Sequence, residues 1–345
     1  MNILRYSIDN LELKNFGIIG SASFDHFSNI NLIIGENGTG KTFLLKALYA
    51  AARSMEEYQR GDDVRSINEI LAEKLRWTFQ IEKLGDLVTK GADDPLDFRV
   101  ALKDKELEYR FGQDCTRKMV NVNGPSTPKE GNSICIPAKE VLSLFSIILK
   151  SRDIDKTFGF DDTYYDLVRA LQISPSIGKN YTVFSKSRKI VSNVIDGKVE
   201  YDNDTGKWYY KNSKNQKFSI GSTSEGVKKI AIMDRLLANG YLDKNSIIFI
   251  DEIESALHPD AICQFLDMID SIANDMGIQV FITSHSYFVI KKLYLIALQR
   301  KGSVTCISLN KDNAPQIFDM YEGMPKNSII DTSVRLYEQE INEVL

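Results

Sequence analysis

Apolar and polar residues alternate over Leu11–Phe16, and this two-residue period predicts a strand with one buried face. A second short strand is expected over Ser21–His26. Ile30–Ile34 is an apolar run of strand length, and the residues from Phe43 onward have helical character. The chain is therefore expected to open with three strands, the third of which leads into a helix.

The second half of the chain repeats this mixture of strands and helices. Ile247–Ile250 is a continuous apolar run, which suits a parallel strand buried on both faces. Gln279–Ser286 reads as another strand, one that ends near a histidine. Before these two strands, Val227–Leu237 carries an apolar stripe at helical spacing, which predicts a helix that ends at Asn239–Gly240.

Residues 61–219 are expected to form an insertion, part helical and part β. A charged helical pattern runs from Ala50 to about Arg76 and is broken at Gly61. The further elements predicted in this part are strands at Leu75–Ile81, Tyr109–Phe111 and Ile134–Ile136, a helix at Pro137–Ser143, a helix at Asp161–Leu171, and a hairpin of Val199–Tyr201 with Trp208–Tyr210.

The turn after the third strand reads G-E-N-G-T-G-K-T and fits the phosphate-binding loop G-x-x-x-x-G-K-[ST]. Its glycines allow backbone N–H groups to converge on a triphosphate, at the positive end of the following helix. Lys41 is expected to reach the β- and γ-phosphates, and the Thr42 hydroxyl to ligate Mg²⁺. The predicted ATP-binding residues are Gly35, Glu36, Asn37, Gly38, Thr39, Gly40, Lys41 and Thr42.

Two acids follow the apolar run at 247–250. Asp251 is expected at the tip of this strand, where it would hold the hydration shell of Mg²⁺. Glu252 points elsewhere and would orient or deprotonate a water molecule. The sequence therefore predicts ATP and Mg²⁺ as ligands, with Lys41 and Glu252 as catalytic residues and Thr42 and Asp251 as metal ligands.

The N-terminal layout resembles the ATP-binding-cassette (ABC) ATPases of the SMC, RecF and "overcoming lysogenisation defect" type, on the strength of Asn15–Phe16 and the loop Gly35–Thr42. The resemblance implies an α/β fold, a P-loop NTPase of ABC type with an antiparallel β subdomain and a helical/β insertion. It implies one domain, residues 1–345, with a core lobe at 1–60 and 220–315, the insertion at about 61–219, and a helical tail at 323–345.

The same resemblance implies further site residues. Ser224 and Gly226 match the ABC signature, which binds the γ-phosphate held by a second subunit, although Ser224 could also be an ordinary helix cap. His285 matches the switch histidine, and residues 254–259 resemble the D-loop. Gln80, 39 residues past Lys41, has the spacing of the glutamine that contacts Mg²⁺ and the attacking water, or it is a surface glutamine.

The composition and charge of the chain limit which partners and which cell compartment these motifs allow. The chain has 345 residues, 43% of them hydrophobic, and a net charge of −4, which disfavours bulk coating of nucleic acid. Residues 179–229 nevertheless carry eleven Lys/Arg and five Asp/Glu, a local +6, which is either a solvated face or a surface for a phosphate backbone. The four scattered cysteines are expected to be free, and the absence of a membrane-spanning apolar stretch favours the cytoplasm.

The resemblance thus implies an ATPase that forms a homodimer, or a higher oligomer, around ATP. Closing and reopening of the dimer would control a partner effector, a nuclease or toxin encoded nearby, in phage defence. Two alternatives remain open: a RecF-like clamp that binds DNA, and a nucleotide-gated scaffold with little turnover. A transporter subunit is disfavoured by the long insertion, and no membrane partner is expected.

Overall fold

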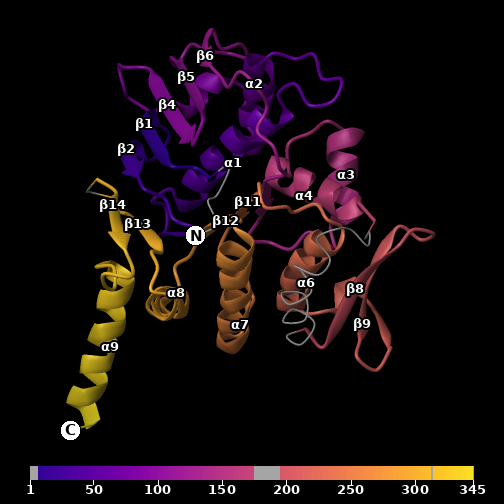
Figure 1. Ribbon diagram of the computed structural model, residues 1–345, viewed down its shortest axis with the longest axis vertical. Helices are drawn as coiled ribbons and strands as arrows, with labels where there is room; N and C mark the ends of the chain where they lie inside the picture. The colour runs from indigo at the N-terminus through magenta and orange to yellow at the C-terminus, as the bar shows by residue number, and fades with distance from the viewer. Residues whose placement is uncertain (1–6, 175–194, 312–313, 345) are drawn as a thin grey trace.

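The computed structural model describes residues 7–174, 195–311 and 314–344. Its centre is a six-stranded sheet in the order β14-β13-β3-β12-β11-β7, parallel except for the edge strand β14 (Figure 1). The strands are β3 (Ile30–Gly35), β7 (Ile134–Ile136), β11 (Ile247–Ile250), β12 (Gln279–Thr283), β13 (Thr305–Leu309) and β14 (Gln316–Asp319).

Two antiparallel sheets accompany the central one. The larger has the order β2-β1-β4-β5-β6, and the smaller has the order β10-β9-β8. Their strands are β1 (Asn10–Phe16), β2 (Gly20–Asp25), β4 (Leu96–Leu102), β5 (Lys105–Phe111), β6 (Asn121–Asn123), β8 (Gly197–Asp202), β9 (Lys207–Asn212) and β10 (Lys217–Ser219). Residues 96–136, which the expected insertion included, therefore supply strands to both larger sheets.

Helices pack on both faces of the central sheet, and the last helix of the chain extends away from it. They are α1 (Lys41–Glu57), α2 (Ile67–Phe79), α3 (Phe145–Asp153), α4 (Asp162–Gln172), α6 (Glu225–Ala238), α7 (Pro259–Asp270), α8 (Tyr287–Arg300) and α9 (Ser328–Val344). Short helical turns occupy η1 (Leu84–Leu87), η2 (Ile220–Ser222) and η3 (Ser271–Asp275). Among the described residues, no helix is long and apolar enough to cross a membrane.

The side chains of β3 alternate between two hydrophobic cores. Leu32 and Ile34 pack in the core that includes residues of α6, α7 and α8. Ile33 packs on the opposite face, in the core shared by α1 and the larger antiparallel sheet. The two cores hold β3, whose carboxyl end leads into the phosphate loop, between the helical layer and the antiparallel sheet.

The predicted α/β class with an antiparallel subdomain is confirmed, but two local predictions are wrong. Residues 75–79 belong to helix α2 and not to a strand. Ser66 and Glu69 form a reciprocal capping box that starts this helix, and buried residues such as Leu71 and Leu75 recur at helical spacing. No helix covers Pro137–Ser143, because the next one begins only at Phe145.

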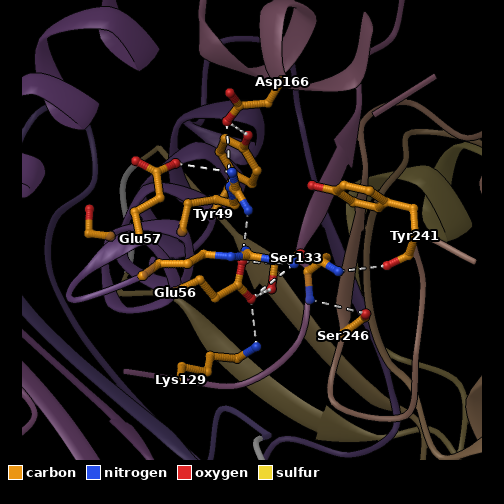
Figure 2. Close-up of polar contacts among 12 residues, drawn as sticks. Tyr49, Glu56, Glu57, Lys129, Ser133, Asp166, Tyr241 and Ser246 are labelled. Carbon is orange, nitrogen blue, oxygen red and sulfur yellow. Dashed lines mark hydrogen bonds and ion pairs between the residues drawn. The ribbon is translucent and has the colours of Figure 1, made fainter. Parts of the chain in front are cut away.

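The carboxyl-terminal end of α1 is fixed by a buried ion pair (Figure 2). Lys129 Nζ lies 2.6 Å from Glu56 Oε1, and neither side chain is exposed. Ser133 donates its N–H and its hydroxyl to the same carboxylate, at 2.9 and 2.6 Å. Lys129 also donates to the carbonyl oxygen of Asn245, which precedes β11. The pair therefore ties the helix of the phosphate loop to the segments that enter β7 and β11.

A second group of buried charges joins α1 to α2 and α4. Lys74 Nζ lies 3.1 Å from carboxylate oxygens of both Asp162 and Asp166. Tyr49 donates its hydroxyl to Asp166 (Figure 2). Burial raises the pKa of Asp162 to about 6, although Lys74 opposes the shift. Because each charge faces an opposite one, the three helices are held in a single relative placement.

Lys129→Met is expected to destabilise the fold by about 3–5 kcal/mol, because it leaves the Glu56 carboxylate buried without its lysine. Burial alone would raise the pKa of Glu56, but Lys129 and Arg53 outweigh it and the pKa is lowered. The stabilisation is therefore present at neutral pH and lost on acidification. Denaturant unfolding would measure the loss. The exposed pair Lys14–Asp94 supplies the control, since Lys14→Met should change stability little.

Candidate functional site

The phosphate loop connects β3 to α1 through glycines that other residues could not replace. Gly38 and Gly40 have φ angles of 78° and 96°, in the left-handed region. At Gly35 a Cβ atom would lie 2.4 Å from the carbonyl oxygen of Leu309 on β13. The loop therefore keeps its backbone close to the neighbouring strand, with its amides at the N-terminus of α1, the end of a helix that attracts anions.

Lys41 folds back over the loop. Its Nζ donates to the carbonyl oxygens of Gly35 and Glu36, at 2.8 and 2.9 Å. Burial lowers the pKa of Lys41, and the nearby Glu252 and Asp251 oppose the shift. The ammonium group is thus held where the loop closes, beside the acids that follow β11.

Thr42 and Asp251 meet at the carboxyl edge of the sheet. The Thr42 hydroxyl lies 2.9 and 3.1 Å from the two carboxylate oxygens of Asp251, although 209 residues separate them. Thr283 at the end of β12 donates its hydroxyl to the same carboxylate, at 2.6 Å. Hydroxyl and carboxylate oxygens are the ligands that Mg²⁺ prefers, with water and phosphate oxygens completing its shell. The donor set of Thr42 and Asp251 therefore fits Mg²⁺.

Glu252 follows with a left-handed backbone, φ 44°. Its N–H donates to the Thr283 hydroxyl at 2.8 Å. Its side chain lines a cavity of about 540 Å³ together with Lys41, Thr42 and the apolar residues Phe43 and Phe79. The strained backbone turns Glu252 away from the direction of Asp251 and toward the space beside the phosphate loop.

Lys229 is a site residue that motif reasoning missed. Its Nζ donates to the carbonyl oxygens of Glu252 and Asp251, at 2.6 and 3.2 Å. It is buried, and burial lowers its pKa to about 8. The sequence holds one sign of this role. Lys229 shares the buried face of α6 with Met233 and Leu236, at positions i, i+4 and i+7, where an apolar residue would be expected. Lys229 connects the helix that begins at Ser224 to the turn that carries the acids.

His285 and Glu254 form a pair at the end of β12. The His285 N–H donates to Glu254 Oε1 at 2.8 Å, and its Nδ1 lies 3.2 Å from the same oxygen. About half of the His285 side chain is exposed, while Glu254 is largely buried. The histidine is therefore oriented by an acid of the predicted D-loop, and its role as the switch residue stays a prediction.

Ser224 caps helix α6 and is exposed. Its hydroxyl accepts the N–H of Val227 at 3.4 Å. A Cβ atom on Gly226 would lie 2.8 Å from the carbonyl oxygen of Ala256 in the predicted D-loop. The structure is therefore compatible with both roles of Ser224, helix cap and signature residue, since a capping serine at an exposed helix start can also face a second molecule. Neither Ser224 nor Gly226 lines the cavity beside Lys41.

Gln80 ends helix α2 with φ 52°. Its neighbours Phe79 and Ile81 line the cavity beside Lys41, but Gln80 does not. Two strands flank β11, namely β12 and β7, and the Asp251 N–H donates to the carbonyl oxygen of Ile136 in β7 at 2.9 Å. The metal role of Gln80 stays a prediction.

Comparison with known proteins agrees with this arrangement. The family described as "AAA domain, putative AbiEii toxin, Type IV TA system" matches residues 30–291, which is 262 of the 345 residues. The DNA replication and repair protein RecF of Francisella tularensis subsp. novicida (strain U112) and that of strain SCHU S4 are each 47% identical over 47 residues. These residues are 14% of this chain, which spans only 14% of the length of those relatives.

Solved SMC heads share the fold. The Smc head domain of Pyrococcus yayanosii has a TM-score of 0.55 at 10% identity, over 90% of this chain and 96% of that one. The Smc head bound to the C-winged helix domain of ScpA gives 0.54 at 14% identity, over 90% and 97%. Identities this low show the fold alone. Together with the family match they confirm the predicted resemblance, and the chain belongs to this family of AAA domains, with the ABC-type ATPase fold of SMC heads.

Proposed function

We propose that this chain binds ATP with Mg²⁺ and hydrolyses it. The observation that carries the proposal is the contact of Thr42 with Asp251 at the mouth of a cavity lined by Lys41 and Glu252. Lys41 and the loop amides would hold the phosphates, and Thr42 and Asp251 the cation, which stabilises charge on the transferred phosphoryl group. Glu252 would orient the attacking water and accept its proton.

The site is proposed to be completed by a second copy of the chain. Ser224 is exposed and lies outside the cavity beside its own Lys41, so its hydroxyl and helix N-terminus are available to a γ-phosphate held by a neighbour. In this proposal two ATP molecules lie between two chains. Binding closes the dimer and hydrolysis reopens it, which gives the protein two states that differ in shape.

The proposed purpose of this cycle is to control an effector protein in antiphage defence. The description of the family names a putative toxin and a type IV TA system, which supports a role for this chain in a system of that kind. The effector, a nuclease or toxin, would be held in one nucleotide state and released in the other. Steady-state turnover separates this cycle from a scaffold that only senses ATP, because the scaffold would bind nucleotide with little phosphate release.

Lys41→Ala is expected to abolish ATP binding. The substitution removes the cation held at the closure of the phosphate loop, and charge-assisted hydrogen bonds are about twice as strong as neutral ones. Calorimetric titration with ATP and Mg²⁺ would measure the loss. Lys14→Ala is the control, because the exposed Lys14 pairs with Asp94 and does not line this cavity, and it should bind ATP as the wild type does. Unchanged affinity in Lys41→Ala would refute the nucleotide site.

A RecF-like role in DNA binding is the second candidate function. The 47-residue match to RecF, a protein named for DNA replication and repair, supports it. Part of the basic stretch, residues 179–194, lies outside the described residues. The remainder includes the sheet of β8, β9 and β10, where Lys214 and Lys217 are exposed and Lys217 pairs with Asp202 at 3.3 Å.

Neutralising Lys211, Lys214 and Lys217 together is expected to weaken duplex DNA binding if this surface contacts phosphates. Each lost contact would also reduce the slope of log affinity against log salt by about one. Fluorescence anisotropy across a salt series would measure both. The exposed lysines Lys90 and Lys103 serve as control positions elsewhere. Absence of wild-type DNA affinity at about 50 mM salt would remove this candidate.

A further inference from the structure

Helix α9 carries an apolar stripe that the other residues described by the structure leave exposed. Ile330, Val334, Tyr337 and Ile341 follow one another at steps of four, three and four residues, the spacing of one helix face. Val334, Tyr337 and Ile341 are exposed by 49%, 64% and 38%. A helix that stayed in water would carry polar residues at these positions, so the stripe indicates an interaction surface.

Helix α8 carries a second such stripe. Phe288, Leu295 and Leu298 are exposed by 52%, 41% and 40% and lie on one side of the helix. The opposite side, which includes Ile290 and Leu293, is buried against the central sheet. Helix α8 is therefore apolar on two sides, and only one of them is buried by the part of the chain that the structure describes.

The two stripes do not cover each other within one molecule. Figure 1 shows α8 nearly end-on and α9 along its full length, so that the two axes cross at a steep angle. Only the first turn of α9, at Ile329 and Ile330, packs against the core. The rest of α9 extends away from the body, and the apolar side chains of both stripes remain exposed.

The charges around the stripes are complementary. Helix α9 contains four acids and Arg335, a net charge of −3, while α8 contains three bases and no acid, a net charge of +3. Two of the α8 bases are already paired, Lys292 with Asp267 and Arg300 with Asp270. Lys291 on the stripe, and Lys301 just after it, form no ion pair within the described residues and are exposed. The acids of α9 are Asp331, Glu338, Glu340 and Glu343.

We propose that a second copy of this chain covers both stripes, with α9 of each molecule docked on α8 of the other. One two-fold axis then buries all four stripes, since each chain carries both halves of the contact. The helices suit one another in length, at about 21 Å for the 14 residues of α8 and about 26 Å for the 17 residues of α9. Pairing α9 with α9 would instead bring like charges together.

This contact is separate from the proposed ATP-dependent dimer. It uses neither Lys41 nor Ser224, so it is expected without nucleotide and in Lys41→Ala. A chain with two different two-fold contacts can form tetramers or longer arrays when ATP is added. The contact would then set how many ATPase sites are gathered in one particle.

Paired charge reversals test the proposal. One variant carries Glu338→Lys and Glu340→Lys on α9, and the other carries Lys291→Glu and Lys301→Glu on α8. Each variant alone opposes like charges across both copies of the contact and is expected to be monomeric. An equimolar mixture restores opposite charges at both contacts and is expected to form dimers. Multi-angle light scattering without nucleotide would measure the masses. The matched control is Glu12→Lys with Asp25→Lys, both exposed on the larger antiparallel sheet and outside α8 and α9.

Three results would overturn the proposal. A wild-type chain that is monomeric without nucleotide would show that the stripes do not bind a second copy. An α8 variant that remains dimeric would indicate pairing through α9 alone. Two variants that are each monomeric and stay monomeric when mixed would show that the reversals act by some route other than charge pairing between α8 and α9.

Discussion

Glu252→Gln is expected to retain ATP binding and to lower the rate of hydrolysis by about 10²–10⁴-fold, the usual contribution of a positioned general base. An amide has nearly the size of a carboxylate but cannot accept the proton of the attacking water. The substitution leaves the contact of Asp251 with Thr42 in place. It also leaves the hydrogen bond from the residue 252 N–H to Thr283. ATP should therefore accumulate in a closed dimer that does not reopen.

Glu254→Gln is the matched control for this prediction. Glu254 lies two residues further on and accepts hydrogen bonds from His285 rather than lining the cavity. It should affect turnover only through the placement of that histidine. Phosphate release and calorimetry on both variants would separate catalysis from binding. Wild-type turnover in Glu252→Gln, together with a large loss in Glu254→Gln, would move the base to Glu254.

Ser224→Arg is expected to eliminate both ATP-induced dimerisation and hydrolysis, while each chain still binds ATP. A bulky cation at the start of α6 would prevent the helix N-terminus from approaching the γ-phosphate held by a second chain. The residue is exposed, so the substitution disturbs no core packing. Ser222→Arg, two residues earlier and also exposed, is the matched control and should retain more activity.

Mixing Ser224→Arg chains with Lys41→Ala chains should restore part of the activity. In a mixed dimer, the intact phosphate loop of the first chain faces the intact Ser224 of the second, so one composite site is complete. Light scattering with a non-hydrolysable ATP analogue and phosphate release from the mixture would test this. Mixed dimers that form but stay inactive would contradict a shared site.

The sequence predicted those parts of the site whose signal is local. The phosphate loop is fixed by glycines that adopt positive φ angles, and the run of apolar residues at 247–250 marks a buried strand before two acids. The role of Lys229 is different, because its partners are backbone carbonyls 22 and 23 residues away that no side-chain motif records. The contacts of Lys229 can be predicted only once α6 is known to lie beside the end of β11.

The misread strand at residues 75–79 has a similar cause. Alternation in Leu75, Trp77 and Phe79 matched a strand period, but the capping box at Ser66 and contacts with α1 and α4 made the segment helical. The pairing of β7 in the central sheet likewise could not be predicted from the sequence. Three residues, Ile134–Ile136, carry too little pattern to reveal that they pair with β11, the strand that precedes Asp251.

The position of β3 has a consequence for how the chain is made. Its two neighbours in the sheet, β12 and β13, begin 279 − 30 = 249 and 305 − 30 = 275 residues after β3 begins. Thr42 and Thr283, which both contact Asp251, are 283 − 42 = 241 residues apart. At about 5–20 residues per second, ribosomal synthesis of that interval takes roughly 12–48 s. Both strands that pair with β3 are therefore synthesised long after β3 and its phosphate loop have left the ribosome, and the contact of Thr42 with Asp251 can form only once residue 251 has been made.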